Sequence, residues 1–216
     1  MGMSGHGMRA ARWGVGTVLA LGALVGCGSG DEKPSAHAGA SSAAAGPTKG
    51  PGDYRPPTAL CPKVDFGPLT AAVAPTAGAP KGELTGSDPS TAAGAACLQA
   101  FRTTGTKADG RSTVYCTAWK DVPTAIKQYA YRLSSAPKEA QGAVVKESGL
   151  GGEAFRYRNL KDAAPFADDL QLVVRDSNME CEVQVQSLKP LTDQRVEAAW
   201  PAMAVTVRTL LPELRS

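Results

Sequence analysis

Residues 170–186 read LQLVVRDSNMECEVQVQ, and this stretch decides the fold. Apolar side chains occupy alternate positions on both sides of a turn at 176–178, namely Leu170, Leu172, Val174, Met179, Cys181, Val183 and Val185. Polar side chains alternate with them in the second half, namely Glu180, Glu182, Gln184 and Gln186. Because neighbouring side chains of a strand point to opposite faces, the pattern predicts an antiparallel hairpin with one buried face and one face in water.

Further strand and helix patterns surround this hairpin. We expect strands at 93–103, 112–119, 143–147 and 153–158, with a loop at 75–87. We expect helices at 61–73, 121–135 and about 193–211. Asp121 is a suitable N-cap for the second helix, Pro137 should end it, and Pro201 should kink or divide the third. The order α-β-β-α-β-β-β-β-α predicts an α+β fold, in which an antiparallel sheet carries helices packed on one face.

Four cysteines follow Cys27, namely Cys61, Cys97, Cys116 and Cys181. An even number in an exported domain indicates two disulfides, and the spacing matches no zinc module. Of the three pairings that can form, we predict Cys97–Cys116, because these residues lie on the two arms of the hairpin expected at 93–119. The remaining pair, Cys61–Cys181, would join the first helix to the buried face of the sheet. We expect no metal and no cofactor.

The first 26 residues have the features of an export signal. Arg9 and Arg12 precede an uncharged run at 13–26, which is shorter than the roughly 20 residues that span a membrane as a helix. The run ends in Leu24-Val25-Gly26-Cys27, which resembles the lipobox of bacterial lipoproteins. That resemblance implies a diacylglyceryl group on the Cys27 sulfur, cleavage just before Cys27, and a lipid anchor at the outer face of the cytoplasmic membrane.

Composition divides the rest of the chain into a tether and a domain. Residues 27–57 are rich in Gly, Ser, Ala and Pro, so they bury too little surface to offset their ordering entropy. Residues 58–216 have the length of one typical domain. We therefore expect a lipoprotein signal peptide at 1–26, the lipidated Cys27 with a flexible tether at 27–57, and a single α+β domain at 58–216.

Charge and residue content exclude several classes of function. The 23 basic and 20 acidic residues give a net charge of +3, which is too small for a typical nucleic-acid binder. The histidines, His6 and His37, precede the expected domain, so a serine–histidine triad has no base there. The segment 149–152 (GLGG) lacks the Lys-Ser/Thr of a phosphate-binding loop, and we interpret it as a turn between strands.

Carboxylates are the remaining candidates for acid–base chemistry or calcium binding. Asp168 and Asp169 are adjacent and would point to opposite faces of a strand, and with Asp162 they match no known calcium loop. Glu180 and Glu182 share the face expected in water, where a row of solvated charges is the ordinary interpretation. We therefore expect no catalytic residue.

An exposed aromatic residue is a candidate contact surface. Tyr131 falls off the apolar stripe of its predicted helix. We therefore expect it to be exposed and to mark a surface for a partner.

Four features of the expected domain form a pattern: the segment 61–65 (CPKVD) before a helix, Cys97 and Cys116 beside a hairpin, the segment 150–154 (LGGEA) before a strand, and the late Cys181. In this pattern the domain resembles the small membrane lipoproteins of streptomycetes and mycobacteria. The likeness covers most of residues 58–216 in pattern. It implies a location and an architecture rather than an activity, although some similar lipoproteins sit beside envelope-stress signalling systems.

Two classes of function follow from these features. We favour a non-catalytic binding or regulatory module at the cell envelope, whose partner is an envelope protein or a cell-wall or lipid ligand. A carrier of a small molecule or lipid would need an apolar cavity between the sheet and the helices. An envelope hydrolase would instead need a cleft with two facing carboxylates of raised pKa.

Overall fold

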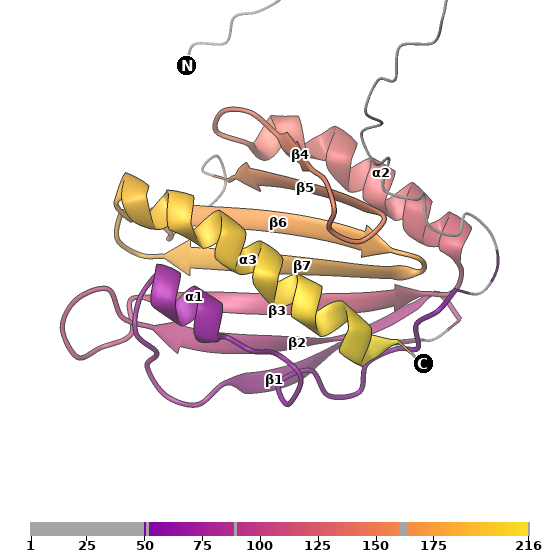
Figure 1. Cartoon of the computed structure of the whole chain (residues 1–216), viewed down its shortest axis with the longest axis horizontal. Coiled ribbons are helices and arrows are strands. Elements are labelled where there is room, and N and C mark those ends of the chain that lie inside the picture. The colour runs from indigo at the N-terminus through magenta and orange to yellow at the C-terminus, as the bar shows by residue number, and fades with distance from the viewer. Residues whose placement is uncertain (1–49, 51, 89, 160–163, 216) are drawn as a thin grey trace, which may run out of the picture. The chain divides into compact units, whose positions relative to one another are not determined.

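The computed structural model describes residues 50, 52–88, 90–159 and 164–215. Within these residues, seven strands form one antiparallel sheet and three helices pack against it (Figure 1). The strands are β1 (Lys81–Asp88), β2 (Ala92–Phe101), β3 (Gly110–Trp119), β4 (Val145–Glu147), β5 (Glu153–Arg158), β6 (Asp168–Asp176) and β7 (Met179–Ser187). The helices are α1 (Gly67–Ala72), α2 (Val122–Glu139) and α3 (Asp193–Leu214). The predicted α+β class with an antiparallel sheet is confirmed.

The hairpin predicted at 170–186 forms the middle of the sheet. The strand order is β1-β2-β3-β7-β6-β5-β4, so β6 and β7 have a neighbour on both sides. Cys181 lies opposite Val174 in the β6–β7 pair, and Ser177 turns the chain with a φ of 52°. All of β6 is buried, and so is β7 apart from the half-buried Gln184.

The predicted elements occur in the predicted order, with one additional strand. Strand β1 begins inside the segment 75–87, where the sequence predicts a loop. It is an edge strand that pairs only with β2, and a bulge interrupts the pairing between Leu84 and Ser87. Residues 81–86 and 88 of β1 are all exposed, so this strand shows no alternation of apolar and polar side chains that would have predicted it.

Pro137 does not end α2, and Pro201 does not divide α3. Helix α2 continues through Pro137 to Glu139, so the prediction that Pro137 ends it is wrong. Helix α3 runs undivided through Pro201 and Pro212. The predicted N-cap of α2 is confirmed, because the Asp121 side chain accepts a 2.8 Å hydrogen bond from the backbone N–H of Thr124.

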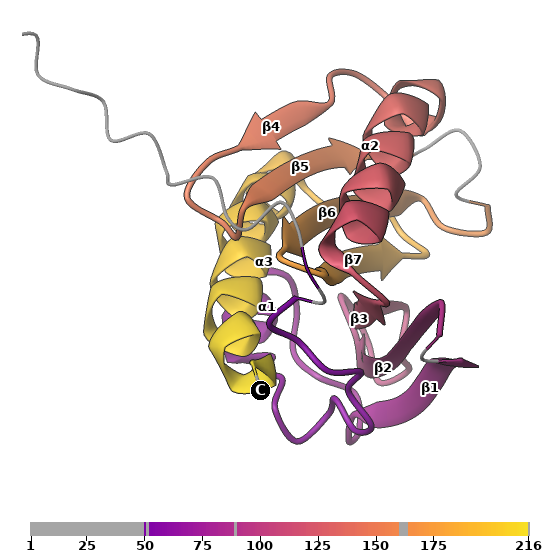
Figure 2. The same ribbon diagram turned by 90° about the vertical axis from the view of Figure 1, so that its right-hand side faces the viewer.

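The helices lie on both faces of the sheet, so the expectation that they pack on one face is wrong. Figure 2 shows α1 and α3 on one side of the sheet and α2 on the other. On the α3 side, Met203, Val207 and Leu210 are fully buried. On the α2 side, the Tyr129 and Phe155 rings meet edge to face with centroids 5.3 Å apart. Val173 also faces α2, and its apolar side chain in an otherwise polar position was the signal for this second covered face.

Both disulfides differ from the predicted pairing. The bonds are Cys61–Cys97 and Cys116–Cys181, not Cys97–Cys116 and Cys61–Cys181. The reason is the register of the β2–β3 hairpin, in which Cys97 lies opposite Val114 and Cys116 lies opposite Ala95. A shift of two residues keeps both sulfurs on the α3 side but separates them along the strands.

Each cysteine therefore bonds to the partner that the sheet brings closest. Cys116 lies directly opposite Cys181 in the β3–β7 pair, with the Cα atoms 4.1 Å apart. Cys97 reaches Cys61 at the start of the segment leading to α1, with the Cα atoms 5.0 Å apart. One bond thus joins two neighbouring strands, and the other fastens the N-terminal segment to the sheet.

Non-reducing peptide mapping should recover Cys61–Cys97 and Cys116–Cys181 as the linked pairs. Replacing either pair by alanine should lower the free energy of unfolding by about 2–5 kcal/mol, with the larger loss for Cys116/Cys181 because its loop spans 65 residues rather than 36. Urea denaturation measures the loss. A peptide linking Cys97 to Cys116 would contradict this strand register.

Candidate functional site

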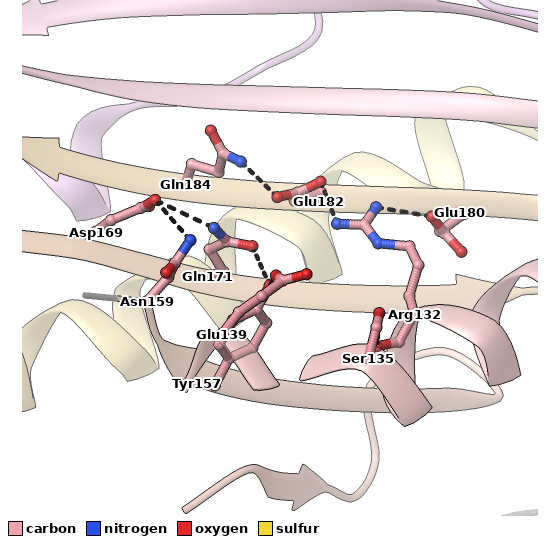
Figure 3. A network of polar contacts seen from close by, with 10 residues as sticks. All are labelled: Arg132, Ser135, Glu139, Tyr157, Asn159, Asp169, Gln171, Glu180, Glu182 and Gln184. Atoms are coloured by element: carbon pink, nitrogen blue, oxygen red, sulfur yellow. Dashed lines mark hydrogen bonds and ion pairs between the residues drawn. The ribbon is translucent and has the colours of Figure 1, made fainter. Parts of the chain in front are cut away.

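A network of charged and polar side chains lies between α2 and the sheet (Figure 3). Arg132 of α2 reaches β7 with both terminal nitrogens of its guanidinium. Its Nη1 lies 2.9 Å from Glu180 Oε1, and its Nη2 lies 2.5 Å from Glu182 Oε2. The two glutamates are only 6% and 8% exposed, so the expectation of a row of solvated charges is wrong.

Helical periodicity places Arg132 over the acidic strand. The buried positions of α2 are Val122, Ala125, Tyr129 and Ala136. Arg132 follows Tyr129 by three residues and precedes Ala136 by four, so it lies on the same stripe. Sequence reasoning did not predict this cluster. Its signal is a lone arginine within a buried stripe, together with two glutamates on one face of a strand.

Burial and the neighbouring charges shift the pKa values of Glu180 and Arg132 in opposite directions. Burial raises the pKa of Glu180, and the Arg132 guanidinium lowers it without fully offsetting the burial. Burial lowers the pKa of Arg132, but the two carboxylates outweigh that effect and raise it overall. Glu180 Oε2 has no hydrogen-bond partner among the described residues. Arg132 therefore supplies the positive charge that faces these two buried carboxylates.

Further side-chain hydrogen bonds lie beside this cluster, between the end of α2 and strands β5, β6 and β7. The hydroxyl of Tyr157 lies 2.6 Å from Gln171 Oε1 and 3.0 Å from Glu139 Oε2, so two acceptors compete for one proton. Gln171 donates in turn to Asp169 Oδ2 at 3.1 Å, and Gln184 donates to Glu182 Oε1 at 2.6 Å. These bonds connect the end of α2 to the sheet.

The two adjacent aspartates lie on opposite faces of β6, as predicted. Asp168 accepts a hydrogen bond from the backbone N–H of Leu191 and pairs with Arg158 on the α3 side. Asp169 faces α2 and is 3% exposed. Burial raises the pKa of Asp169, although hydrogen bonds from Gln171 and Gln186 lower it. The sheet thus separates Asp168 from Asp169, and they form no catalytic pair.

A second polar cluster holds the segment that precedes the expected domain. Tyr54 is 5% exposed, and its hydroxyl donates to Asp176 Oδ2 at 2.5 Å. Arg215, just after α3, donates to the same Asp176 oxygen at 2.9 Å. Asn178 brackets the Tyr54 backbone, accepting from its N–H and donating to its carbonyl, each at 3.0 Å. We call Tyr54, Asp176, Asn178 and Arg215 the Tyr54 clamp.

Because of the Tyr54 clamp, the packed part of the chain includes Tyr54, which precedes the expected start at residue 58. Residues up to 57 were expected to belong to a flexible tether, but Tyr54 is anchored to the β6–β7 turn and to the end of α3. Burial and the Asp176 hydrogen bond raise the pKa of the Tyr54 hydroxyl, so it stays protonated and continues to donate. A single tyrosine in a Pro/Gly-rich segment gave no periodic signal from which to predict this contact.

The remaining candidates fall into three groups. Tyr131 is 68% exposed, as predicted. The segment 149–152 is a turn between β4 and β5, as predicted. Cys27 and Asp162 lie outside the described residues, so their predicted roles remain predictions.

Two features are absent from the described residues. They contain no helix long and apolar enough to cross a membrane. No group of three or more His, Cys, Asp or Glu side chains in that part of the chain could hold a metal ion.

Comparison of the chain with protein-family models and with curated proteins finds no match. The chemistry of the two clusters must therefore be interpreted from their own geometry. In both, a guanidinium is fixed by a carboxylate that the fold has buried, Arg132 by Glu180 and Glu182 and Arg215 by Asp176. Both clusters join distant parts of the chain, and neither presents a pair of unpaired carboxylates.

Replacing Arg132 by methionine should lower the free energy of unfolding by about 2–4 kcal/mol at neutral pH, because it leaves Glu180 and Glu182 buried without a cation. This is below the cost of breaking a fully buried pair, since the Arg132 side chain is 31% exposed. Burial already raises the folded-state pKa of Glu180, and without the cation that pKa rises further above its unfolded value. The loss should therefore shrink as the pH falls through the carboxyl range, where the folded state takes up more protons.

Urea denaturation from acid to neutral pH measures this dependence. The matched control is Arg132→Met combined with Glu180→Gln and Glu182→Gln, which should show a smaller, pH-independent loss. An Arg132→Met loss that is equal at all pH values would contradict the role of the ion pairs.

Proposed function

We propose that this protein is a membrane-anchored extracytoplasmic lipoprotein that acts as a non-catalytic binding or regulatory module at the cell envelope. Envelope-stress sensing is one such regulatory role. The lipobox-like segment 24–27 and the preceding apolar run support export and anchorage. The disulfides Cys61–Cys97 and Cys116–Cys181 support an oxidising compartment outside the cytoplasm, because disulfides persist there.

The position of Arg132 is the observation that carries the non-catalytic part of the proposal. A carboxylate-dependent hydrolase needs two carboxylates that face a substrate, one of them protonated. Here the glutamates that share one face, Glu180 and Glu182, both face Arg132 beneath α2. The cavities beside the 149–152 turn are lined by neither of them. Their ion pairs support a structural role.

The packing between the sheet and α3 is also evidence on whether the protein is a carrier of a small molecule or lipid. Fully buried side chains fill this interface, among them Leu170, Val183, Met203 and Val207. A carrier of whole lipids needs a large apolar cavity at such a position. The dense packing therefore supports recognition at the surface, where Tyr131 is one candidate contact.

A Cys27→Ser variant tests the anchorage on which this function depends. We expect the wild-type protein in the membrane fraction with an acylated N-terminal Cys27 in its mass spectrum, because the sulfur is the site of lipidation. The variant should remain uncleaved or leave the membrane fraction. A Ser29→Ala variant is the matched control and should behave as the wild type. Unchanged processing and unchanged fractionation of Cys27→Ser would reject the lipoprotein assignment.

A further inference from the structure

A cavity of about 270 Å³ lies beside the Tyr54 clamp. Its lining includes Tyr54, Leu150, Asp176, Arg208, Leu211 and Arg215. This volume is slightly below the about 300–1,000 Å³ of pockets for drug-sized ligands. It suits a small molecule or the polar head of a larger one.

The cavity holds one positive charge that the described residues do not neutralise. Arg215 is balanced by Asp176, whose Oδ2 lies 2.9 Å from its Nη2. Arg208 is exposed, and its guanidinium has no hydrogen-bond or ion-pair partner among the described residues. The charged lining therefore amounts to two arginines and one aspartate, an excess of +1.

Helix α3 and the residue that follows it contribute both arginines to the cavity. Arg208 and Leu211 are three residues apart and so lie on the same face of α3, and Arg215 lines the cavity from the position just after the helix. Leu211 is buried. The 149–152 turn adds Leu150 to the lining, and this side chain is 3% exposed. The cavity thus combines the Arg208 guanidinium with an apolar lining.

We propose that this cavity binds a phosphodiester group, with the Arg208 guanidinium as the main contact. A phosphodiester carries one negative charge, equal to the excess charge of the cavity, and its two free oxygens match the planar donors of arginine. The clamp fixes Arg215 and the Tyr54 hydroxyl at the edge of the site.

The position of the cavity indicates two sources for the phosphodiester. Tyr54 lines the cavity and lies on the segment that leads back to Cys27. In this respect the inference rests on the proposed anchorage, which would hold the cavity near the phosphodiester head groups of membrane lipids. The other source is a soluble phosphodiester of the envelope.

Isothermal titration of the full chain with glycerophosphoglycerol, in a neutral maltoside detergent, tests the site directly. We expect saturable binding by the wild type and a loss of at least about tenfold in affinity for Arg208→Gln, since a charged hydrogen-bonding partner is removed. The matched control is Arg102→Gln, which removes an exposed arginine outside this cavity and should change the affinity by less than about twofold. Because the probe is soluble, the result does not depend on the lipid anchor.

A competition experiment then separates the two sources. The same titration is repeated on the full chain in maltoside micelles with and without phosphatidylglycerol, because the maltoside carries no phosphodiester. A lower apparent affinity in the micelles that contain phosphatidylglycerol assigns the site to a lipid head group, and equal affinities assign it to a soluble phosphodiester. No binding in the detergent, or equal losses for Arg208→Gln and Arg102→Gln, would overturn the proposal.

Discussion

A carboxylate that is buried away from water must be protonated or paired with a cation, and β7 presents two of them side by side to the underside of α2. Arg132 meets this constraint by contacting Glu180 and Glu182 with separate nitrogens. The contact requires α2 to lie across the centre of the sheet. That position in turn covers Phe155 and Tyr157 and closes a face that would otherwise be exposed to water.

The two faces of the sheet are stabilised by different means. The α3 face has an apolar interior reinforced by two disulfides, Cys61–Cys97 and Cys116–Cys181, which fasten it to the N-terminal segment and across the central strands. The α2 face depends on hydrogen bonds and ion pairs. At one end of the domain, the Tyr54 clamp joins the entering chain to the β6–β7 turn and the end of α3. The Tyr54 clamp therefore fixes the N-terminal segment to the sheet and to the end of α3. The cavity lined by Arg208 lies beside this clamp.

Alternation made the central hairpin predictable, because every second residue of β6 and β7 is an apolar side chain buried on the α3 side. Edge strand β1 was not predictable in this way, because residues 81–86 and 88 of this strand are exposed and carry no such pattern. The disulfide pairing failed for a different reason. Alternation determines which face of the sheet a cysteine occupies, but the register between strands determines its partner. A shift of two residues in the β2–β3 register separates Cys97 from Cys116, and Cys116 lies opposite Cys181 instead.

The candidate site was harder to predict than the fold. Glu180 and Glu182 were correctly placed on one face, but their environment depends on Arg132, which is about fifty positions away in the sequence. The Tyr54 clamp joins residues more than 120 positions apart. Contacts over such separations leave no local periodic signal. Only the three-dimensional arrangement shows which partners these polar residues contact and that Arg208 has no partner among the described residues.

Amide hydrogen exchange of the full chain, followed by NMR, tests most directly whether α2 closes the polar face. If Arg132 holds the helix on the sheet, the amides in the middle of α2 should exchange as slowly as those of β6 and β7, because both open only on global unfolding. Exchange across all of α2 at the rate of an unprotected helix, while β6 and β7 remain protected, would contradict this role of Arg132. It would then show that Glu180 and Glu182 are accessible to solvent and substrates.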